Sequence, residues 1–286
     1  MRTSQQPEPV TIRHDASRRR RGWGVLLVLL LMLEEGVAAA VVPLNGRSQH
    51  MVFTSAQVQA IAAAAYDKRL QELARQGKLD RDPALVERAR RIAGRIIAQA
   101  IVLKPIAAHW TWEIHVASGG QFDAYCMAGG KILVGDAFLG DQRFTDGELA
   151  ALLGHEVAHA IAEHVREQLS AVPDLEPAYA HLGLDDVVAV LGWDLSVTFR
   201  LAPLSRLHEL EADDIGIYLA AKAGYDPHAL LQFYRKLGRL GDGSDFFNSH
   251  GANDQRLQAV ENFVTYAEPL YKASLAAHRE PGFVFH

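Results

Sequence analysis

Two histidines and a glutamate stand close together near the middle of the chain, in the run Gly154-His155-Glu156-Val157-Ala158-His159. On an α-helix, residues four apart differ by about 40° in direction and about 6 Å along the axis. The imidazoles of His155 and His159 can therefore reach one metal ion. Glu156 lies at the edge of the same face, where its carboxylate can polarise a metal-bound water. The run predicts a metal site with a general base beside it.

This H-E-x-x-H pattern is typical of zinc peptidases, but it also arises by coincidence on amphipathic helices, so a third ligand has to be found. The related pattern with a third histidine needs Gly at position 162 and His at 165, whereas this chain has Ala162 and Val165. His164 is about half a turn away from the metal face and is predicted to be a packing or surface histidine. The third ligand must come from a more distant segment.

A second acidic run follows at residues 205–213, where a helix is predicted to begin. Glu209 and Asp213 are four residues apart and share a face, while Glu211 points roughly the opposite way. One carboxylate can bind the metal while the other accepts the N–H of a ligating histidine and fixes its tautomer. We expect Glu209 to be the third ligand and Asp213 the acceptor. The alternative is that these acids form a solvated helix face.

The composition limits what else the chain can do. Its 286 residues are 49% hydrophobic and 22% charged, which suits one large domain or two small ones with a substantial core. Cys126 is the only cysteine, so an intrachain disulfide and a cysteine-only zinc site are excluded. The net charge of -5 argues against a nucleic-acid-binding protein. A metal must be held by histidines and carboxylates.

Helix signals place the metal motif inside a mostly helical chain. Thr54 with Gln57 forms a capping box that opens a helix ending at Gly77. A second helix begins at Asp82-Pro83 and ends before Pro105. A capping box of Thr145 with Glu148 opens the helix of the metal motif, which is expected to continue past His164. Further helices are predicted over residues 206–223, 227–237 and 254–264, after a segment that Pro173, Pro177 and Pro203 are expected to break.

Between these helices the pattern alternates, as it does in strands. Residues 110–116 are predicted to form a strand, and residues 125–127 and 132–134 a hairpin around Gly129-Gly130. We expect an α+β fold, mostly helical, with a small β-sheet packed against the metal-site helix.

The first forty residues differ from the rest. A run of four arginines, Arg18 to Arg21, precedes an apolar run, Val25 to Leu33, and the small residues Ala38 to Ala40 follow. These are the parts of a secretory signal peptide. The apolar run is about half as long as a bilayer span requires. We expect residues 1–40 to be a signal peptide and 41–286 the catalytic domain; the alternative is an uncleaved membrane anchor with the domain outside the cytoplasm.

The chain resembles metallopeptidase family 48, the gluzincins that include Oma-type and periplasmic quality-control zinc proteases. Four segments within residues 48–265 carry the resemblance, in the order expected for the family. They are Asp123-Ala124-Tyr125 leading into Ala128-Gly129-Gly130-Lys131-Ile132, Glu148 through His159, Ser205-Arg206 through Glu209 to Ala212-Asp213, and Ser249-His250 followed by Arg256. The resemblance implies a zincin-like fold with one zinc per chain.

The resemblance also implies roles for individual residues. His155, His159 and Glu209 would be the zinc ligands, and Glu156 the catalytic base of a zinc endopeptidase. His250 and Arg256 would lie near the cleft, where each is a candidate donor to the oxyanion. His250 could instead cap the zinc in a latent state.

The expected substrates are peptides or proteins, among them misfolded envelope proteins, in the periplasm or outside the cell. A peptide could add to the strand at residues 125–127 by main-chain hydrogen bonds. Two alternatives stay open. One is a non-catalytic chaperone or adaptor on a zincin fold; the other is a membrane-tethered helical scaffold whose motif is accidental.

Overall fold

The computed structural model describes residues 40–120, 123–140, 143–239, 250, 254–277 and 282–285. The chain divides into two units, Met1–Ala39 and Ala40–His286. The predicted signal peptide or anchor lies in the first unit, outside the described residues apart from Ala40. The second unit is the one described below.

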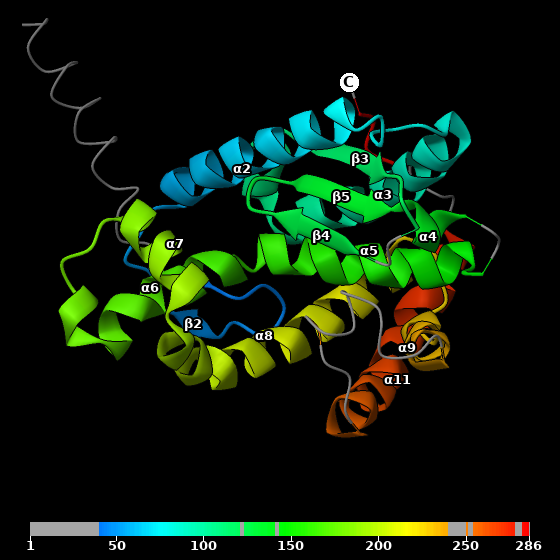
Figure 1. Ribbon diagram of the computed structural model, residues 1–286. Coiled ribbons are helices and arrows are strands. Elements are labelled where there is room, and N and C mark those ends of the chain that lie inside the picture. Colours follow the sequence, from blue (N-terminus) through cyan, green and yellow to red (C-terminus); the bar gives the residue numbers. More distant parts are fainter. Residues whose placement is uncertain are drawn as a thin grey trace, which may run out of the picture. The chain divides into compact units, whose positions relative to one another are not determined.

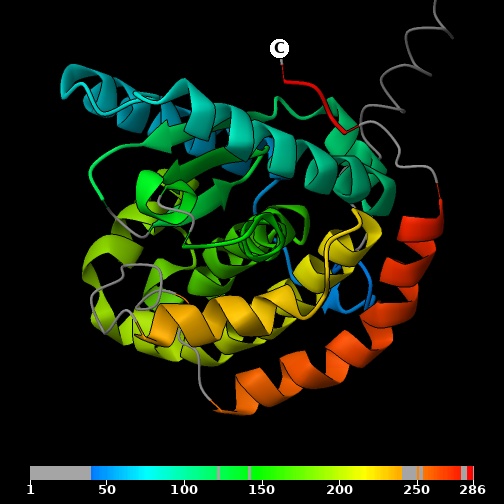
Figure 2. The same cartoon turned by 90° about the vertical axis from the view of Figure 1, so that its right-hand side faces the viewer.

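Helix α5 (Asp146–Ile161) carries the metal motif and lies at the centre of this unit. The capping box of Thr145 and Glu148 opens it as predicted, and 13 of its 16 residues are buried. A helix that is buried all round needs neighbours on every side. Its neighbours are the sheet, α3 (Pro83–Leu103), α8 (Leu195–Lys222) and α9 (Ala229–Arg239), which surround it in the view along its axis (Figure 2).

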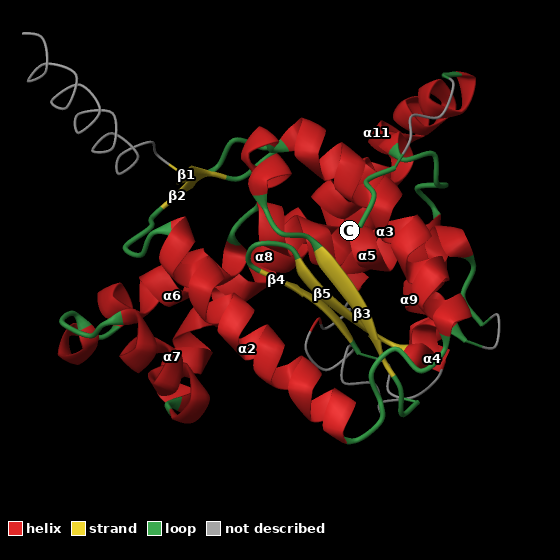
Figure 3. Ribbon diagram, turned by 90° about the horizontal axis from the view of Figure 1, so that it is seen from above, coloured by secondary structure: helices red, strands yellow, loops and turns green. Residues whose placement is uncertain are grey.

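A three-stranded sheet lies on one side of α5, with strand order β3-β5-β4. Strands β4 (Ala124–Met127) and β5 (Lys131–Gly135) form the predicted antiparallel hairpin, with Gly129 and Gly130 at positive φ in its turn. Strand β3 (Glu113–Ala117) runs parallel to β5 and begins three residues later than predicted. The hairpin leaves β4 at one edge of the sheet (Figure 3), next to α5 (Figure 1).

Two long helices, α2 (Ser55–Arg75) and α3 (Pro83–Leu103), precede the sheet in the chain. Both have the predicted N-caps, Thr54 in a capping box and Asp82 before a proline. Helix α2 contacts β4 and β5, whereas α3 contacts β3 and α5. The sheet is thus enclosed between α2 on one side and α5 on the other (Figure 1).

The segment after the metal motif is more helical than the prolines predicted. Helices α6 (His164–Leu175), α7 (Leu184–Trp193) and α8 (Leu195–Lys222) follow α5. The predicted break at Pro173 and Pro203 is wrong, because Pro173 lies inside α6 and Pro203 lies inside α8. Pro203 is exposed and lies in the third turn of α8, where a proline removes one hydrogen bond of the helix.

The remaining elements complete the unit. They are β1 (Ala40–Val41), β2 (Ser48–Gln49), η3 (Pro105–His109), α4 (Asp136–Leu139), η4 (Pro177–Tyr179), α9 (Ala229–Arg239) and α11 (Asp254–Ala276), which extends twelve residues beyond its predicted end. Among the described helices, no single one has the length and apolar composition of a membrane span. Helices α7 and α8 reach that composition only as a pair bent by 98°.

A pair of glycines lets α5 and α8 cross at close range. A Cβ at Gly154 would lie 2.8 Å from the carbonyl oxygen of Gly216, and a Cβ at Gly216 would lie 2.7 Å from the backbone nitrogen of His155. Any larger residue would force the two backbones apart. This crossing brings the acidic turns of α8 against the metal motif (Figure 1).

We expect Gly216→Ala to lower the free energy of unfolding by about 1–3 kcal/mol, the usual effect of overpacking a tight contact. Gly192→Ala in α7 is the matched control, because a Cβ there meets no atom within 4 Å. The control should be neutral or stabilising by up to about 1 kcal/mol. Urea unfolding of the three proteins measures the difference. Equal midpoints for Gly216→Ala and Gly192→Ala would show that the helices tolerate a wider spacing.

Candidate metal centre and active site

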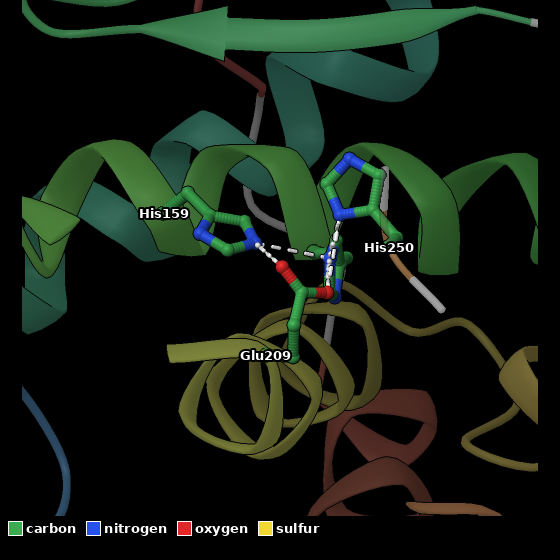
Figure 4. A group of neighbouring side chains, drawn as sticks. His159, Glu209 and His250 are labelled. Carbon is green, nitrogen blue, oxygen red and sulfur yellow. Dashed lines mark hydrogen bonds and ion pairs between the residues drawn. The ribbon is translucent and has the colours of Figure 1, made fainter. Parts of the chain in front are cut away.

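Four side chains from three parts of the chain converge in front of α5. His155 and His159 come from α5, Glu209 from α8, and His250 from the segment before α11 (Figure 4). The Nε2 atoms of His155 and His159 are 3.1 Å apart, and Glu209 Oε2 and Oε1 lie 3.4 and 3.5 Å from them. These spacings are close to the roughly 3.3 Å that separates two ligands of a tetrahedral zinc ion with bonds near 2.0 Å.

The hydrogen bonds of His155 favour a cation among the four side chains of the cluster. His155 Nδ1 is 2.9 Å from Asp213 Oδ1, an acceptor, so Nδ1 carries a proton and Nε2 is the nitrogen that would bind a metal ion. Burial by itself lowers the pKa of His155, but hydrogen bonds with Asp213 and Glu209 overcome this and raise it to about 9. The cluster therefore attracts positive charge to Nε2, and the donor set fits a zinc ion.

Asp213 lies where a carboxylate partner of a ligating histidine would lie. It is buried, and besides His155 it accepts hydrogen bonds from Arg256 (Nε to Oδ2, 2.6 Å) and the Tyr234 hydroxyl (2.9 Å). Burial alone would raise the pKa of Asp213, but Arg256 and His155 lower it. The ring of His155 is thereby held in one orientation by a charged, fully bonded partner.

Arg256, the other candidate oxyanion donor, lies against the two α8 carboxylates and the His250 backbone. Its guanidinium is buried, bonds both oxygens of Asp213, contacts Glu209 Oε2 at 3.0 Å and donates to the backbone carbonyl of His250. These partners occupy its donors around the two α8 carboxylates and the His250 segment. Arg256 therefore links α11 to the metal cluster through the α8 residues Asp213 and Glu209.

His250 lies on the open side of the cluster. Its Nδ1 is 3.2 Å from His155 Nε2 and 3.1 Å from Glu209 Oε2, and its Nε2 is 3.6 Å from Glu156 Oε1. Figure 4 shows its ring above Glu209, across from His159. Its Nδ1 thus lies with the three expected ligand atoms, as a fourth donor, and its Nε2 lies beside the expected base.

Glu156 is buried beside the metal cluster, with Oε1 accepting no hydrogen bond from any described residue. Burial raises the pKa of its carboxyl group. A buried carboxylate oxygen without a donor is unusual unless a ligand or water fills its place. The oxygen is available to take a proton from a molecule bound at the cluster.

The expected length of the metal-motif helix is wrong, and His164 takes the buried one of the two placements expected for it. The metal-motif helix ends at Ile161, because Glu163 has φ of +55° and turns the chain into α6. His164 is therefore not on the far side of one long helix: it is buried, with Nδ1 3.0 Å from Nδ1 of His159. Glu211 is buried as well and lies 3.2 Å from His164. The turn at Glu163 could not be predicted from the sequence, because glutamate rarely adopts a left-handed backbone conformation.

A metal-motif helix beneath a small sheet, with further carboxylates supplied by a second helix, places the chain among the H-E-x-x-H metallopeptidases. Residues 86–264 match the family described as Peptidase family M48, and the chain belongs to this family.

Relatives of known name agree with this assignment. The chain is 36% identical over 167 residues to the mitochondrial metalloendopeptidase OMA1 of Arabidopsis thaliana, covering 57% of this chain and 34% of that protein. It is 24% identical over 210 residues to the beta-barrel assembly-enhancing protease of Yersinia pestis, covering 68% and 42%. It is 27% identical over 158 residues to the metalloprotease LoiP of Escherichia coli, covering 53% and 61%. The matched region thus spans between about a third and three fifths of these relatives.

Proposed function

We propose that this chain is a zinc-dependent endopeptidase that holds one zinc ion through His155, His159 and Glu209. The observation that carries the proposal is the convergence of these side chains beside Glu156, whose buried carboxylate oxygen has no hydrogen-bond donor among the described residues. Three protein ligands would leave one position open, as catalytic sites require. Membership of a metallopeptidase family supports the same function.

Zinc, when bound, supplies a Lewis acid that polarises the peptide carbonyl and makes water acidic enough to attack near neutral pH. The protein supplies the proton transfers. Glu156 takes the proton from the attacking water and returns it to the leaving amine. The Nε2 of His250 lies 3.6 Å from Glu156 and can donate to the negative oxygen that develops during attack.

His250 has a second possible role, because its Nδ1 lies at the fourth corner of the cluster. With Nδ1 bound to zinc, the open position would be filled and the enzyme would be latent. Withdrawal of His250 would admit substrate. The His250→Ala variant separates the roles: activity above wild type supports the latent state, whereas activity well below wild type supports transition-state stabilisation.

The edge of the sheet provides a place for the peptide. Among the described strands, β4 pairs only with β5, so its other edge is available to an extended chain. A pocket beside this edge is lined by Val58, Trp110, Cys126, Ala128 and His159, among others. These residues would lie beside a substrate that is bound through its main chain.

The substrates and location are inferred from the relatives and the N-terminal segment. Main-chain recognition at a strand edge accepts many sequences, which suits unfolded or misfolded protein substrates. Relatives named for beta-barrel assembly and for mitochondria support a site of action outside the cytoplasm. We propose export by residues 1–40, or anchoring of the domain to a membrane by the same segment.

Metal removal tests the function directly. Dialysis against a chelator should abolish cleavage of casein by the full-length protein, and one equivalent of zinc per chain should restore it. Elemental analysis of the untreated and restored proteins measures the stoichiometry. Full cleavage activity in protein shown to contain no metal would refute the proposal.

A further inference from the structure

A second group of buried polar residues lies next to the metal cluster, on the side of His159. It comprises Arg47 from the β1–β2 hairpin, His164 and Glu167 from α6, and His208 and Glu211 from α8. Every member except Arg47 is less than a tenth exposed, and the Arg47 side chain is 26% exposed. We call this group the arginine cluster.

The arginine cluster connects to the metal cluster through one pair of histidines. His164 Nδ1 lies 3.0 Å from His159 Nδ1, while His159 Nε2 faces the metal site. On its other side, His164 Nε2 lies 3.2 Å from Glu211 Oε2. The ring of His164 therefore stands between a candidate zinc ligand and a buried carboxylate.

The positions of the protons follow from these contacts. Glu211 is an acceptor, so the proton of His164 resides on Nε2 and its Nδ1 has a free lone pair. His159 must then donate from Nδ1, which leaves the lone pair of its Nε2 pointing at the metal site. The chain of hydrogen bonds selects the tautomer of His159 that can bind zinc.

Arg47 holds the acceptor end of this chain in place. Its Nε and Nη2 donate to the two oxygens of Glu211 at 2.7 and 2.9 Å, and its Nη1 and Nη2 donate to Glu167 at 2.6 and 2.7 Å. Each carboxylate is thus bound by a two-pronged contact, which orients it as well as neutralising it. Without Arg47, two buried carboxylates would face each other without a cation.

The same contacts explain why this group is not itself a metal site. His164, His208 and Glu211 offer donor atoms close enough together for an ion. However, the guanidinium of Arg47 already provides the positive charge between the carboxylates. In addition, the rings of His164 and His208 stack in parallel, with centroids 4.1 Å apart and an angle of 6°. Stacked rings direct their nitrogens side by side instead of toward one central ion.

We infer that His164 is a positioning residue for the zinc ligand His159, and that Arg47 acts through Glu211 to hold His164 in place. The inference rests on the proposed zinc site. Arg47 precedes β2 by one residue, and the hairpin begins at Ala40, where the described unit begins. The seating of the N-terminal hairpin against α6 and α8 is therefore coupled to zinc retention.

The test measures the rate at which full-length protein loses zinc to a chromogenic chelator, together with kcat and KM. His164→Ala should lose zinc about 10–100-fold faster than wild type, the usual effect of removing a ligand's outer partner, with kcat reduced and KM little changed. His164→Asn places an amide oxygen near the position of Nδ1 and should restore most of the zinc retention. Arg47→Ala should also lose zinc faster. Arg47→Lys should not restore zinc retention, because an ammonium group cannot form a two-pronged contact with each of two carboxylates.

His50→Ala is the matched control, since His50 follows the same hairpin and, among the residues that the structure describes, forms one exposed pair, with Asp174. It should retain zinc like wild type. Circular dichroism and thermal unfolding establish that each variant is folded at the assay temperature. If Arg47→Ala does not fold, Arg47→Lys takes its place, and if His164→Ala does not fold, the Arg47 variants carry the test. A merely structural role would lower the melting temperature without changing zinc loss from the folded protein.

Other results would overturn the inference. Wild-type zinc retention in folded His164→Ala and Arg47→Ala would refute it while leaving the proposed function intact. Two zinc ions in wild type and one in His164→Ala would make the arginine cluster a metal site instead. A wild-type protein that binds no zinc would refute the proposed function along with the inference.

Discussion

Glu156→Gln is expected to abolish peptide cleavage while leaving zinc in place. Glutamine keeps the shape of the side chain but cannot take a proton from water, and proton transfer by a positioned base contributes about 10²–10⁴-fold to a rate. His155 is held by Asp213, and Glu209 lies within hydrogen-bond distance of His250, so these contacts do not pass through Glu156. We therefore expect kcat to fall by at least two orders of magnitude with zinc content unchanged.

The measurement is casein or fluorogenic-peptide turnover with metal analysis of the same samples. Glu72→Gln, on the exposed face of α2, is the matched control and should behave like wild type. Wild-type turnover by Glu156→Gln would assign the base to another residue. A wild-type protein that holds zinc but cleaves no faster than Glu156→Gln would instead favour the non-catalytic chaperone.

Glu209→Ala is expected to lose zinc by more than the 10–100-fold that an outer partner contributes, because a direct ligand is removed. Hydrogen bonds from His155 and His250 lower the pKa of Glu209 although its burial opposes this, so the carboxylate is charged and able to bind a cation. Without this carboxylate, His155, His250 and Arg256 would each lose the negative charge that they contact. Activity should fall together with the zinc content.

Elemental analysis after brief dialysis measures the loss. Asp214→Asn is the matched control, because it removes a carboxylate from the same helix without a hydrogen bond to the metal cluster. Burial raises the pKa of Asp214 to about 7, so its neutral amide should be well tolerated. Zinc retained by Glu209→Ala but lost by His250→Ala would make His250 the third protein ligand.

Much of the fold follows from local signals. The capping boxes at Thr54 and Thr145 and the proline after Asp82 begin helices where the sequence predicts them. The hairpin around Gly129-Gly130 forms as well. These features depend on hydrogen bonds between residues two to four positions apart, so they can be recognised without the rest of the chain.

Helix ends after the metal motif could not be predicted in the same way. Glu163 takes a left-handed conformation with no glycine to mark it, and salt bridges with Lys104 and Arg166 hold its side chain. Lys104 is distant in the sequence. Pro203 lies inside α8 although proline usually interrupts a helix. At both places the helix boundaries differ from those that the local signals predict.

The residue types of the metal centre were determined by the sequence alone. One cysteine excludes thiolate sites, and two histidines with a glutamate at helical spacing specify an imidazole pair beside a base. Helical periodicity also separates Glu209 and Asp213 from Glu211, because residues four apart share a face. It could not reveal that Glu211 has a buried partner of its own.

Only the tertiary structure decided what surrounds the centre. Arg47 and Glu211 are 164 residues apart, yet they meet because α8 crosses α5 at a glycine pair and the N-terminal hairpin packs beside α6. Spacing in the sequence sets the direction of a side chain on its own helix, but not the helix that it faces. That partner depends on how whole helices pack, and this is why His164 and Arg47 emerge as positioning residues only in three dimensions.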